Sequence, residues 1–519
     1  MKPVTSVILK NDRRRKQSEQ NTLTAKIFAK LSFLIVFCTL AGAMIGASIY
    51  ITKKFQILGR PYAFIQLMLY GNFGILFFES IFQVLSSLYF SKDMRILLRM
   101  PIKSSEIVHA KLLKMIMAEY EMEIIMLAIP MTVYGFLNRV GLVYYLYIPA
   151  ILLVLPIIPI CIVAMLVAII MLLTSKIKNK SLVMYITILV STLVLGIITN
   201  QLQLVNPIMN ALQNYETGIG LKNVLFYFVT SILFYILTVG IVSPIFLKGA
   251  IGATINGGKE KTKEKLQLTL NDFKQTKLKK AYLRKEFLLI KRSPIFFIQC
   301  IILPVYFSAM ILGIVIMLFI ASRNYGLEMV FQELSEITAT PLIGGVFLSI
   351  VQIIYMMNFA SVIAVSKEER WSILSKYIPI RLSRQINMKI WIGKLVNFIS
   401  SISVIILYFM MSQNWIHTLL LLLVSIGMNI LGEKIKIMID LKNPKIDWDN
   451  EFTMMKQNTN VMYELFYTMI VIGIVLFTGS ILKNTIVYLM GMGAIVLTLN
   501  FIFSNYIFEN DTKIFEKLY

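Results

Sequence analysis

Charged residues are scarce in this sequence, and acidic residues are the scarcer of the two signs. Only 15% of the 519 residues are Asp, Glu, Lys or Arg, whereas 57% are hydrophobic and the mean hydropathy is +0.75. A soluble globular domain carries about 25% charged residues. This composition excludes an ordinary soluble fold. We expect an integral membrane protein built from helices, because helices satisfy their own backbone hydrogen bonds in hydrocarbon.

Residues that form disulfides or bind metals are also few. The chain has three cysteines, Cys38, Cys161 and Cys300, which lie in or at the edge of apolar runs. It has two histidines, His109 and His417. These residues give neither a disulfide framework nor the spacing of a zinc site. We therefore expect no bound metal.

Motifs of nucleotide binding and catalysis are missing as well. The nearest approach to a phosphate-binding loop is "GATINGGKEK", in which Gly252 and Gly257 have the required spacing. Gly258 stands where the motif needs Lys, and Lys259 is followed by Glu260 instead of Ser or Thr. Neither a nucleophile elbow nor a zinc-protease pair occurs. The sequence predicts that this chain is not an enzyme and binds no cofactor of its own.

Long apolar runs are what the sequence has in abundance. Runs of about 20 residues can cross the roughly 30 Å of hydrocarbon in a bilayer. We predict an all-α polytopic membrane protein of about twelve transmembrane helices, arranged as two six-helix halves with both termini in the cytoplasm. The predicted spans are 31–51, 62–90, 112–137, 142–174, 181–199, 224–247, 295–320, 341–365, 390–411, 416–431, 461–482 and 485–506.

The excess of basic residues fits this topology. The chain has 51 Lys and Arg against 27 Asp and Glu, a formal net charge of +24. Most of the basic residues fall in segments that the predicted topology assigns to the cytoplasm, as the positive-inside rule requires. The charge therefore indicates topology and contact with anionic membrane lipids, and we do not expect nucleic acid as a partner.

A polar segment divides the chain near its middle. Residues 248–292 include the basic stretch "GGKEKTKEKLQ" and then an amphipathic pattern before Pro294. We predict a first six-span half over 1–247, a cytoplasmic linker with an amphipathic helix over 248–292, and a second six-span half over 293–519.

One cytoplasmic loop is repeated. "SKDMRILLRMPIKSSEIVHAK" follows the second run, and "SKEERWSILSKYIPIRLSRQINMK" follows the eighth. An alignment of the two loops pairs Asp93 with Glu368 and Lys111 with Lys389. Each copy predicts a short helix, a proline break and a second helix, which Ser105 caps in the first copy. The duplication favours a docking surface used twice over a simple interfacial hairpin. The residues predicted to act in docking are Asp93, Arg95, Arg99, Pro101, Ser105, Glu368, Arg370, Trp371, Pro379 and Arg381.

A few polar residues lie inside the predicted spans. Glu79 is in the second run, Glu119 and Glu123 are in the third, and Asn358 is in the eighth. An ionisable group in a membrane indicates a functional site, here for a proton or a cationic substrate. The alternative is that the third run enters the membrane later, which leaves its glutamates at the interface. We favour this alternative because acids near a helix end are less costly than acids at the bilayer centre.

Further motifs lead to a family resemblance. Lys285 and Glu286 precede "RSP", and "IDLKNPKIDWDNE" follows the tenth run. Together with the second repeated loop, these motifs resemble the permease subunits of ABC-2-type exporters, in particular the fused two-half putative exporter permeases of Gram-positive bacteria. Two residues depart from the family pattern, since Glu369 replaces a glycine and Ile378 a leucine. The cytoplasmic motif residues are Asp440, Pro444, Lys445, Trp448, Asn450 and Glu451.

The resemblance implies a function as well as a fold. The chain would be the permease subunit of an ATP-driven exporter in the bacterial cell membrane, moving a hydrophobic or amphipathic substrate outward. Two cytosolic ABC ATPase subunits would dock on the repeated loops and would bind the ATP and Mg. We expect Trp448 to be anchored at the membrane interface or in a neighbouring loop. The alternative is a twelve-span secondary transporter of the major facilitator type, whose loop motif is met here by Asp93 and Arg95 but lacks both of its glycines.

Overall fold

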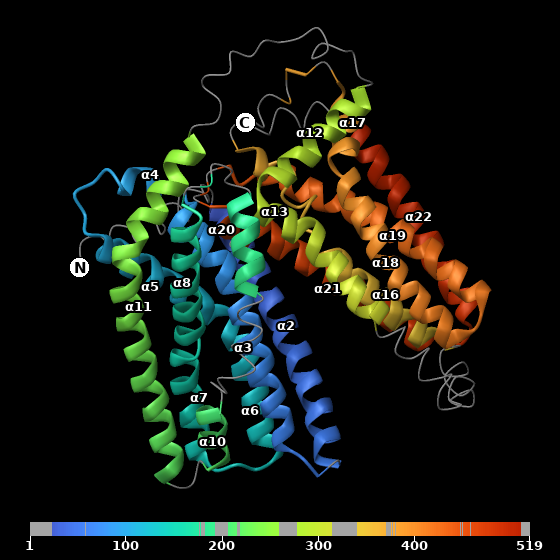
Figure 1. Ribbon diagram of the computed structural model, residues 1–519. Coiled ribbons are helices and arrows are strands. Elements are labelled where there is room, and N and C mark those ends of the chain that lie inside the picture. The colour runs from blue at the N-terminus through green and yellow to red at the C-terminus, as the bar shows by residue number, and fades with distance from the viewer. Residues whose placement is uncertain are drawn as a thin grey trace. The chain divides into compact units, whose positions relative to one another are not determined.

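The computed structural model describes residues 23–57, 59–175, 177, 182–192, 206–214, 218–258, 278–313, 340–369, 375, 377–378, 380–446, 448, 450–456 and 458–509. Within these ranges the chain forms helices joined by turns and no strand, which confirms the all-α class (Figure 1). Eight of the described helices are long and apolar enough to cross a membrane, as in a multi-pass membrane protein. The predicted number of twelve spans and the cytoplasmic placement of the termini are not confirmed.

The chain divides into two compact units, Met1–Gln267 and Leu268–Tyr519. In the first unit, α8 packs against α3 and α11, α2 packs against α6, and α5 packs against α11. The described elements of this unit are α2 (Leu23–Ile57), α3 (Tyr62–Val84), η1 (Leu85–Tyr89), α4 (Met94–Leu97), α5 (Ser104–Glu123), η2 (Ile124–Ala128), α6 (Ile129–Leu137), α7 (Leu142–Val154), α8 (Ile157–Leu173), α10 (Asn206–Gln213) and α11 (Gly218–Gly258).

In the second unit, α16 packs against α18, α19 and α21, and α19 packs against α18 and α22. A core of large apolar side chains, among them Phe347, Tyr408 and Tyr488, fills the space between these helices. The described elements are α12 (Leu278–Arg292), α13 (Pro294–Phe297), η4 (Ile298–Ile302), α16 (Pro341–Met356), α17 (Leu382–Lys389), α18 (Trp391–Ser412), α19 (Trp415–Lys442), α20 (Glu451–Lys456), α21 (Thr459–Ile481) and α22 (Thr485–Glu509).

The eighth predicted span is shorter than the sequence suggested. Its helix, α16, ends at Met356, and the chain continues through turns to Val365 and then forms one turn of 3-10 helix over 366–369. Asn358 explains the stop, because its Oδ1 accepts a hydrogen bond from the backbone N of Ala360 at 3.0 Å. Such local bonds compete with the helical ladder. The predicted span over 341–365 is therefore wrong in its last third, and this part forms a buried loop that leads to Ser366.

The predicted cap at Ser105 is also wrong. Helix α5 begins one residue earlier, at Ser104, and its N-cap is Lys103, whose backbone is extended and whose side chain makes no cap bond. The second copy behaves in the same way, since α17 follows Arg381, again in an extended conformation and without a side-chain cap. In both copies a basic residue after the proline turns the chain into the helix, and the serine lies inside the first turn.

Candidate functional site, a buried ion cluster in the second unit

Three segments that are far apart in the sequence meet at the loop that follows α16. Ser366, Lys367 and Glu368 of this loop are all buried, and so are Glu286 on α12 and Lys389 at the end of α17. Buried charges are rare in proteins unless they are paired. The arrangement therefore depends on how these side chains satisfy one another.

Two carboxylates and three ammonium groups form the cluster. Glu286 Oε2 lies 3.0 Å from Lys367 Nζ, and Glu286 Oε1 lies 3.3 Å from Lys389 Nζ. Glu368 Oε1 lies 2.7 Å from Lys285 Nζ and also contacts Lys389 Nζ. We call Lys285, Glu286, Lys367, Glu368 and Lys389 the ion cluster. Lys389 is paired with both carboxylates, so it joins the α12 end of the cluster to the loop.

The charge state of Glu286 follows from these contacts. Burial by itself would raise its pKa, but Lys367, Lys389 and Lys285 outweigh burial and hold the pKa of Glu286 well below its usual range. The neighbouring Tyr282 is affected in the opposite sense, because burial raises its pKa to about 12. The ion cluster thus contains an ionised glutamate at neutral pH, next to a tyrosine that keeps its proton.

A second set of contacts fixes the backbone of the loop. Asp440, near the end of α19, accepts hydrogen bonds from Val365 N at 2.6 Å and Ser366 N at 3.1 Å, and also from Ser366 Oγ. Asn460 Nδ2 donates to the same carboxylate at 2.9 Å. Four donors on one buried aspartate make a strong, charge-assisted anchor. The loop is thereby attached to α19 and α21.

Trp448 holds the loop from its other side. Its Nε1 donates to the carbonyl oxygen of Ser366 at 3.1 Å, and its ring packs edge-on against Phe296 with 6.1 Å between centroids. The backbone N of Lys445 donates to Ser366 Oγ at 2.9 Å. Of the two anchors expected for Trp448, the neighbouring loop is therefore the one observed. Of the other motif residues, Asn450 is buried, whereas Pro444 and Glu451 are half-buried.

A further group of polar side chains lies deeper between the helices of this unit. Lys436 on α19 is fully buried, and its Nζ lies 3.1 Å from Glu433 Oε1 and 2.7 Å from Glu464 Oε1. The same ammonium donates to the carbonyl oxygens of Tyr355 at 2.5 Å and Asn358 at 3.2 Å. Lys436 therefore satisfies the open carbonyls at the end of α16 and neutralises acids from two helices.

Amide side chains continue this network into α18. Asn358 Nδ2 donates to Asn397 Oδ1 at 2.8 Å, and Asn397 Nδ2 donates to Glu433 Oε1 at 2.9 Å and to Asn429 Oδ1 at 3.1 Å. The other oxygen of Glu433 accepts from Ser361 Oγ. Asn358, predicted as an intramembrane polar residue, thus belongs to a continuous buried network. The sequence analysis missed Asn397, Asn429, Glu433, Lys436 and Glu464.

The network leaves no room at Gly393 on α18. A Cβ at this position would lie 2.0 Å from Glu433 Oε2 and 2.8 Å from Ser361 Oγ. Gly393→Ala should therefore destabilise the protein by about 1–3 kcal/mol, the usual cost of overpacking. The control is Gly473→Ala on α21, where a Cβ meets no atom within 4 Å and the change should be neutral or stabilising by up to about 1 kcal/mol. Unfolding in a denaturing detergent measures both, and equal effects would contradict the packing described.

The first unit contains a simpler version of the same contact. Lys111 Nζ lies 2.6 Å from Asp93 Oδ2 and donates to Ser91 Oγ at 3.5 Å. The repeat aligns Lys111 with Lys389 and Asp93 with Glu368. Ser91 is the first residue of its copy, as Ser366 is of the other. Burial would raise the pKa of Asp93, but Lys111, aided by Lys114, more than offsets it, and the pKa is lowered. Each copy of the repeat thus closes its loop with a pair between an acid and the downstream lysine.

Four of the remaining predicted docking residues are described, and they lie outside the clusters. Arg99, Pro101 and Arg381 are exposed, and Ser105 is half-buried. The guanidinium of Arg381 lies over the ring of Phe508, 5.9 Å from its centroid. The backbone of Arg95 lies in α4, but its side chain is outside the described part of the structure. Arg370, Trp371 and Pro379 also lie outside the described residues.

The three glutamates predicted as intramembrane residues of the first unit differ in burial. Glu79 is half-buried within α3, whereas Glu119 and Glu123 on α5 are buried. Both α5 glutamates precede the apolar segment Ile124–Leu137, the placement expected if the third run enters the membrane late. Within the described residues, neither carboxylate oxygen of Glu123 has a hydrogen-bond partner.

Comparison with known proteins gives one match. Residues 24–213 match a family model described as a putative ATP-binding cassette, a segment of a little over a third of the chain. No curated protein and no solved structure matches the chain. The match supports an ABC-type protein, in agreement with the broader part of the family resemblance.

The match also corrects three predictions. We predicted a permease subunit energised by separate ATPase subunits, a chain that is not an enzyme, and a chain that binds no ATP or Mg itself. A family described as an ATP-binding cassette points instead to an ATPase-type domain within residues 24–213. The phosphate-binding loop motif gave no sign of such a domain, because residues 24–213 do not contain it.

The sequence of the matched segment lacks the motif of a phosphate-binding loop. A phosphate-binding loop needs glycines that expose backbone N–H groups, followed by Lys and by Ser or Thr for Mg²⁺. No Gly-Lys pair occurs within 24–213. The described residues of this segment form helices and connecting turns, and no group of metal-binding side chains is found in the described part of the chain.

Proposed function

We propose that this chain is an ABC-type membrane protein whose second unit changes conformation in an ATP-dependent transport cycle, and that the ion cluster is the element on which this movement acts. The family match and the apolar helices support the first part. The observation that carries the second part is that Lys389 pairs with both Glu286 and Glu368, which lie on different segments.

This pairing allows a change of partners without an unpaired charge. Glu286 has two lysine partners besides its neighbour Lys285, and Glu368 also has two. Breaking a buried pair outright is costly, because it leaves an uncompensated charge. A cluster with shared partners can instead pass between two discrete arrangements, which is what a switching element requires. A movement of α12 relative to the loop and α17 would exchange ion-pair partners in this way.

We also propose the finer features that the sequence predicted. These are twelve spans with both termini in the cytoplasm of a bacterial cell, supported by the distribution of basic residues. The exposed Arg99 and Arg381 support a soluble partner at the two repeated loops.

The test of this function is the accessibility of position 381 during the ATP cycle. This position precedes α17, whose last residue, Lys389, belongs to the ion cluster. In a Cys38→Ser background, Arg381→Cys places a thiol on the exposed residue that precedes α17, while Cys161 and Cys300 are buried. Labelling by a water-soluble maleimide is followed in permeabilised membranes of expressing cells. We expect the rate to change several-fold in Mg-ATP but not in Mg-ADP, and to stay constant at the exposed control Lys483→Cys. Equal rates at position 381 without nucleotide, in Mg-ADP and in Mg-ATP would overturn the proposal.

A further inference from the structure

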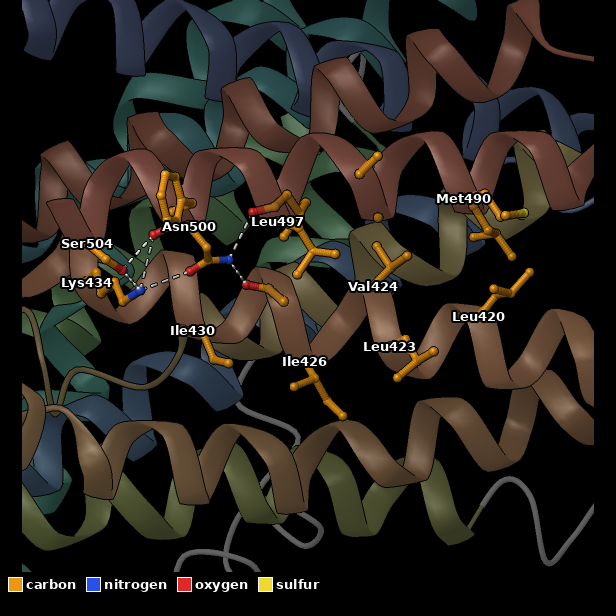
Figure 2. A pocket seen from close by; sticks show the side chains of 16 residues that line it. Leu420, Leu423, Val424, Ile426, Ile430, Lys434, Met490, Leu497, Asn500 and Ser504 are labelled. Atoms are coloured by element: carbon orange, nitrogen blue, oxygen red, sulfur yellow. Dashed lines mark hydrogen bonds between the residues drawn. The ribbon is translucent and has the colours of Figure 1, made fainter. Parts of the chain in front are cut away.

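An apolar groove lies between α19 and α22, and a cation stands at one of its ends. Its volume is about 640 Å³, within the range of ligand sites in proteins. Figure 2 shows Lys434, Asn500 and Ser504 gathered at one end, and Leu420 and Met490 at the other. Among the residues that line the groove, Lys434 is the charged one.

Neutral oxygens hold the ammonium group of Lys434. Its Nζ donates to Ser504 Oγ at 2.7 Å, to Asn500 Oδ1 at 3.3 Å and to the carbonyl oxygen of Asn500 at 3.5 Å. Asn500 Nδ2 in turn donates to the carbonyl oxygen of Gly427 at 2.9 Å, which fixes the amide. Within the described residues, the ammonium is therefore held by neutral groups and makes no ion pair.

The surroundings add to the positive charge at this end. Lys394 on α18 lies beside the same stretch of α19, since its carbonyl oxygen accepts a hydrogen bond from Asn429 Nδ2 at 2.9 Å. The adjacent Glu433 has its carboxylate engaged with Ser361, Asn397 and Lys436. A half-buried lysine next to a second lysine attracts an anion.

The groove is long enough to hold a lipid chain. From Leu420 to Lys434, α19 rises by about 21 Å at 1.5 Å per residue, whereas one leaflet of hydrocarbon is about 15 Å, half of roughly 30 Å. The wall between these residues is formed by Leu423, Gly427 and Ile430 and by residues of α22. The ligand that fits is an amphiphile with an anionic head at Lys434 and an apolar chain along the groove.

We propose that this groove binds an anionic phospholipid, with its phosphate at Lys434 and Ser504 and one acyl chain between α19 and α22. Basic pockets between membrane helices are known to recognise anionic head groups. The site is distinct from the ion cluster, and its test is independent of the ATP-dependent labelling described above.

The experiment measures the thermal unfolding midpoint of the purified full-length protein in a neutral detergent. Phosphatidylglycerol and phosphatidylcholine with identical acyl chains are added separately, and glycerol phosphate serves as the chain-free anion. A ligand that binds the folded state raises the midpoint. We expect phosphatidylglycerol to raise it by several degrees more than phosphatidylcholine, and glycerol phosphate to have no effect.

Variants assign the effect to the groove. Lys434→Gln should remove the difference between the two lipids, Lys434→Arg should retain it, and Lys442→Gln, at the exposed end of the same helix, should leave it unchanged. Gly493→Leu should block the chain path, since a Cβ there already contacts Val424 Cγ2 at 3.6 Å. The proposal fails if the two lipids act equally on the unmodified protein, if Lys434→Gln or Gly493→Leu responds fully, or if glycerol phosphate reproduces the effect.

Discussion

Replacement of Glu286 by glutamine should lower the free energy of unfolding by about 3–5 kcal/mol, the cost of breaking a buried ion pair from one side. The carboxylate lies between Lys367 and Lys389, both buried. An amide of the same shape would leave these two ammonium groups with Glu368 as the one remaining anion of the ion cluster. Unfolding of Glu286→Gln and of the unmodified protein in a denaturing detergent gives the difference directly.

The control for this prediction is Lys285→Gln. Lys285 belongs to the same cluster, but its side chain is 42% exposed, and an exposed ion pair contributes about 1 kcal/mol or less. If both substitutions cost the same, Glu286 does not act as a buried anion.

The pH dependence gives a second measure of the same carboxylate. The cluster lowers the pKa of Glu286 from its ordinary value of 4.5. A carboxylate with a lowered pKa in the folded state contributes its full stabilisation above the unfolded pKa and loses it as the pH falls below that value. The stability difference between the unmodified protein and Glu286→Gln should therefore be largest at neutral pH and should narrow below about pH 4.5.

Lys436→Met should have a comparable effect of about 3–5 kcal/mol, because it leaves two buried carboxylates without a cation. Glu433 and Glu464 lie on different helices and both contact this one ammonium. The same detergent unfolding measures the loss.

A double variant tests whether the loss comes from the orphaned acids. Adding Glu464→Gln to Lys436→Met removes one of the two unpaired charges. The double variant should therefore be more stable than the sum of the two single changes predicts, since residues in one network do not act additively. A strictly additive result would contradict the network.

The repeat was the most informative feature of the sequence. Aligning the two loops placed Asp93 with Glu368 and Lys111 with Lys389, and in the structure each lysine contacts the acid of its own copy. The alignment could not show these contacts, because they depend on how the chain turns after α16. That turn depends in part on the local bond between Asn358 and Ala360, which no hydropathy pattern records.

The deeper network was missed for a different reason. The predicted tenth span ended at residue 431, because the next residues include Glu433, Lys434 and Lys436. In the structure α19 continues to Lys442, with Glu433 and Lys436 turned inward. An acid and a lysine three residues apart face the same side of a helix. The apolar residues that follow Glu433 and Lys436 were the available signal that the helix continues. Charge alone does not mark the end of a membrane helix, because paired charges can be buried.

Function was the least predictable part. The absence of a Gly-Lys phosphate loop led to the expectation that ATP acts elsewhere, and the family match over residues 24–213 overturned it. Residue types can be read from a sequence, but a family relationship rests on many weak similarities along a segment. Both the sequence motifs and the structure single out the buried ion cluster, and the proposed function depends on it.

The most direct test of that dependence repeats the maleimide labelling at Arg381→Cys in a second background. Glu286→Gln combined with Lys389→Met removes one anion and one cation, so the net charge of the ion cluster is kept while its shared pairs are lost. We predict that this variant is still inserted in the membrane but that Mg-ATP no longer changes its labelling rate. If Mg-ATP changes the rate as much as it does with the cluster intact, the ion cluster is not the element that ATP-driven movement acts on.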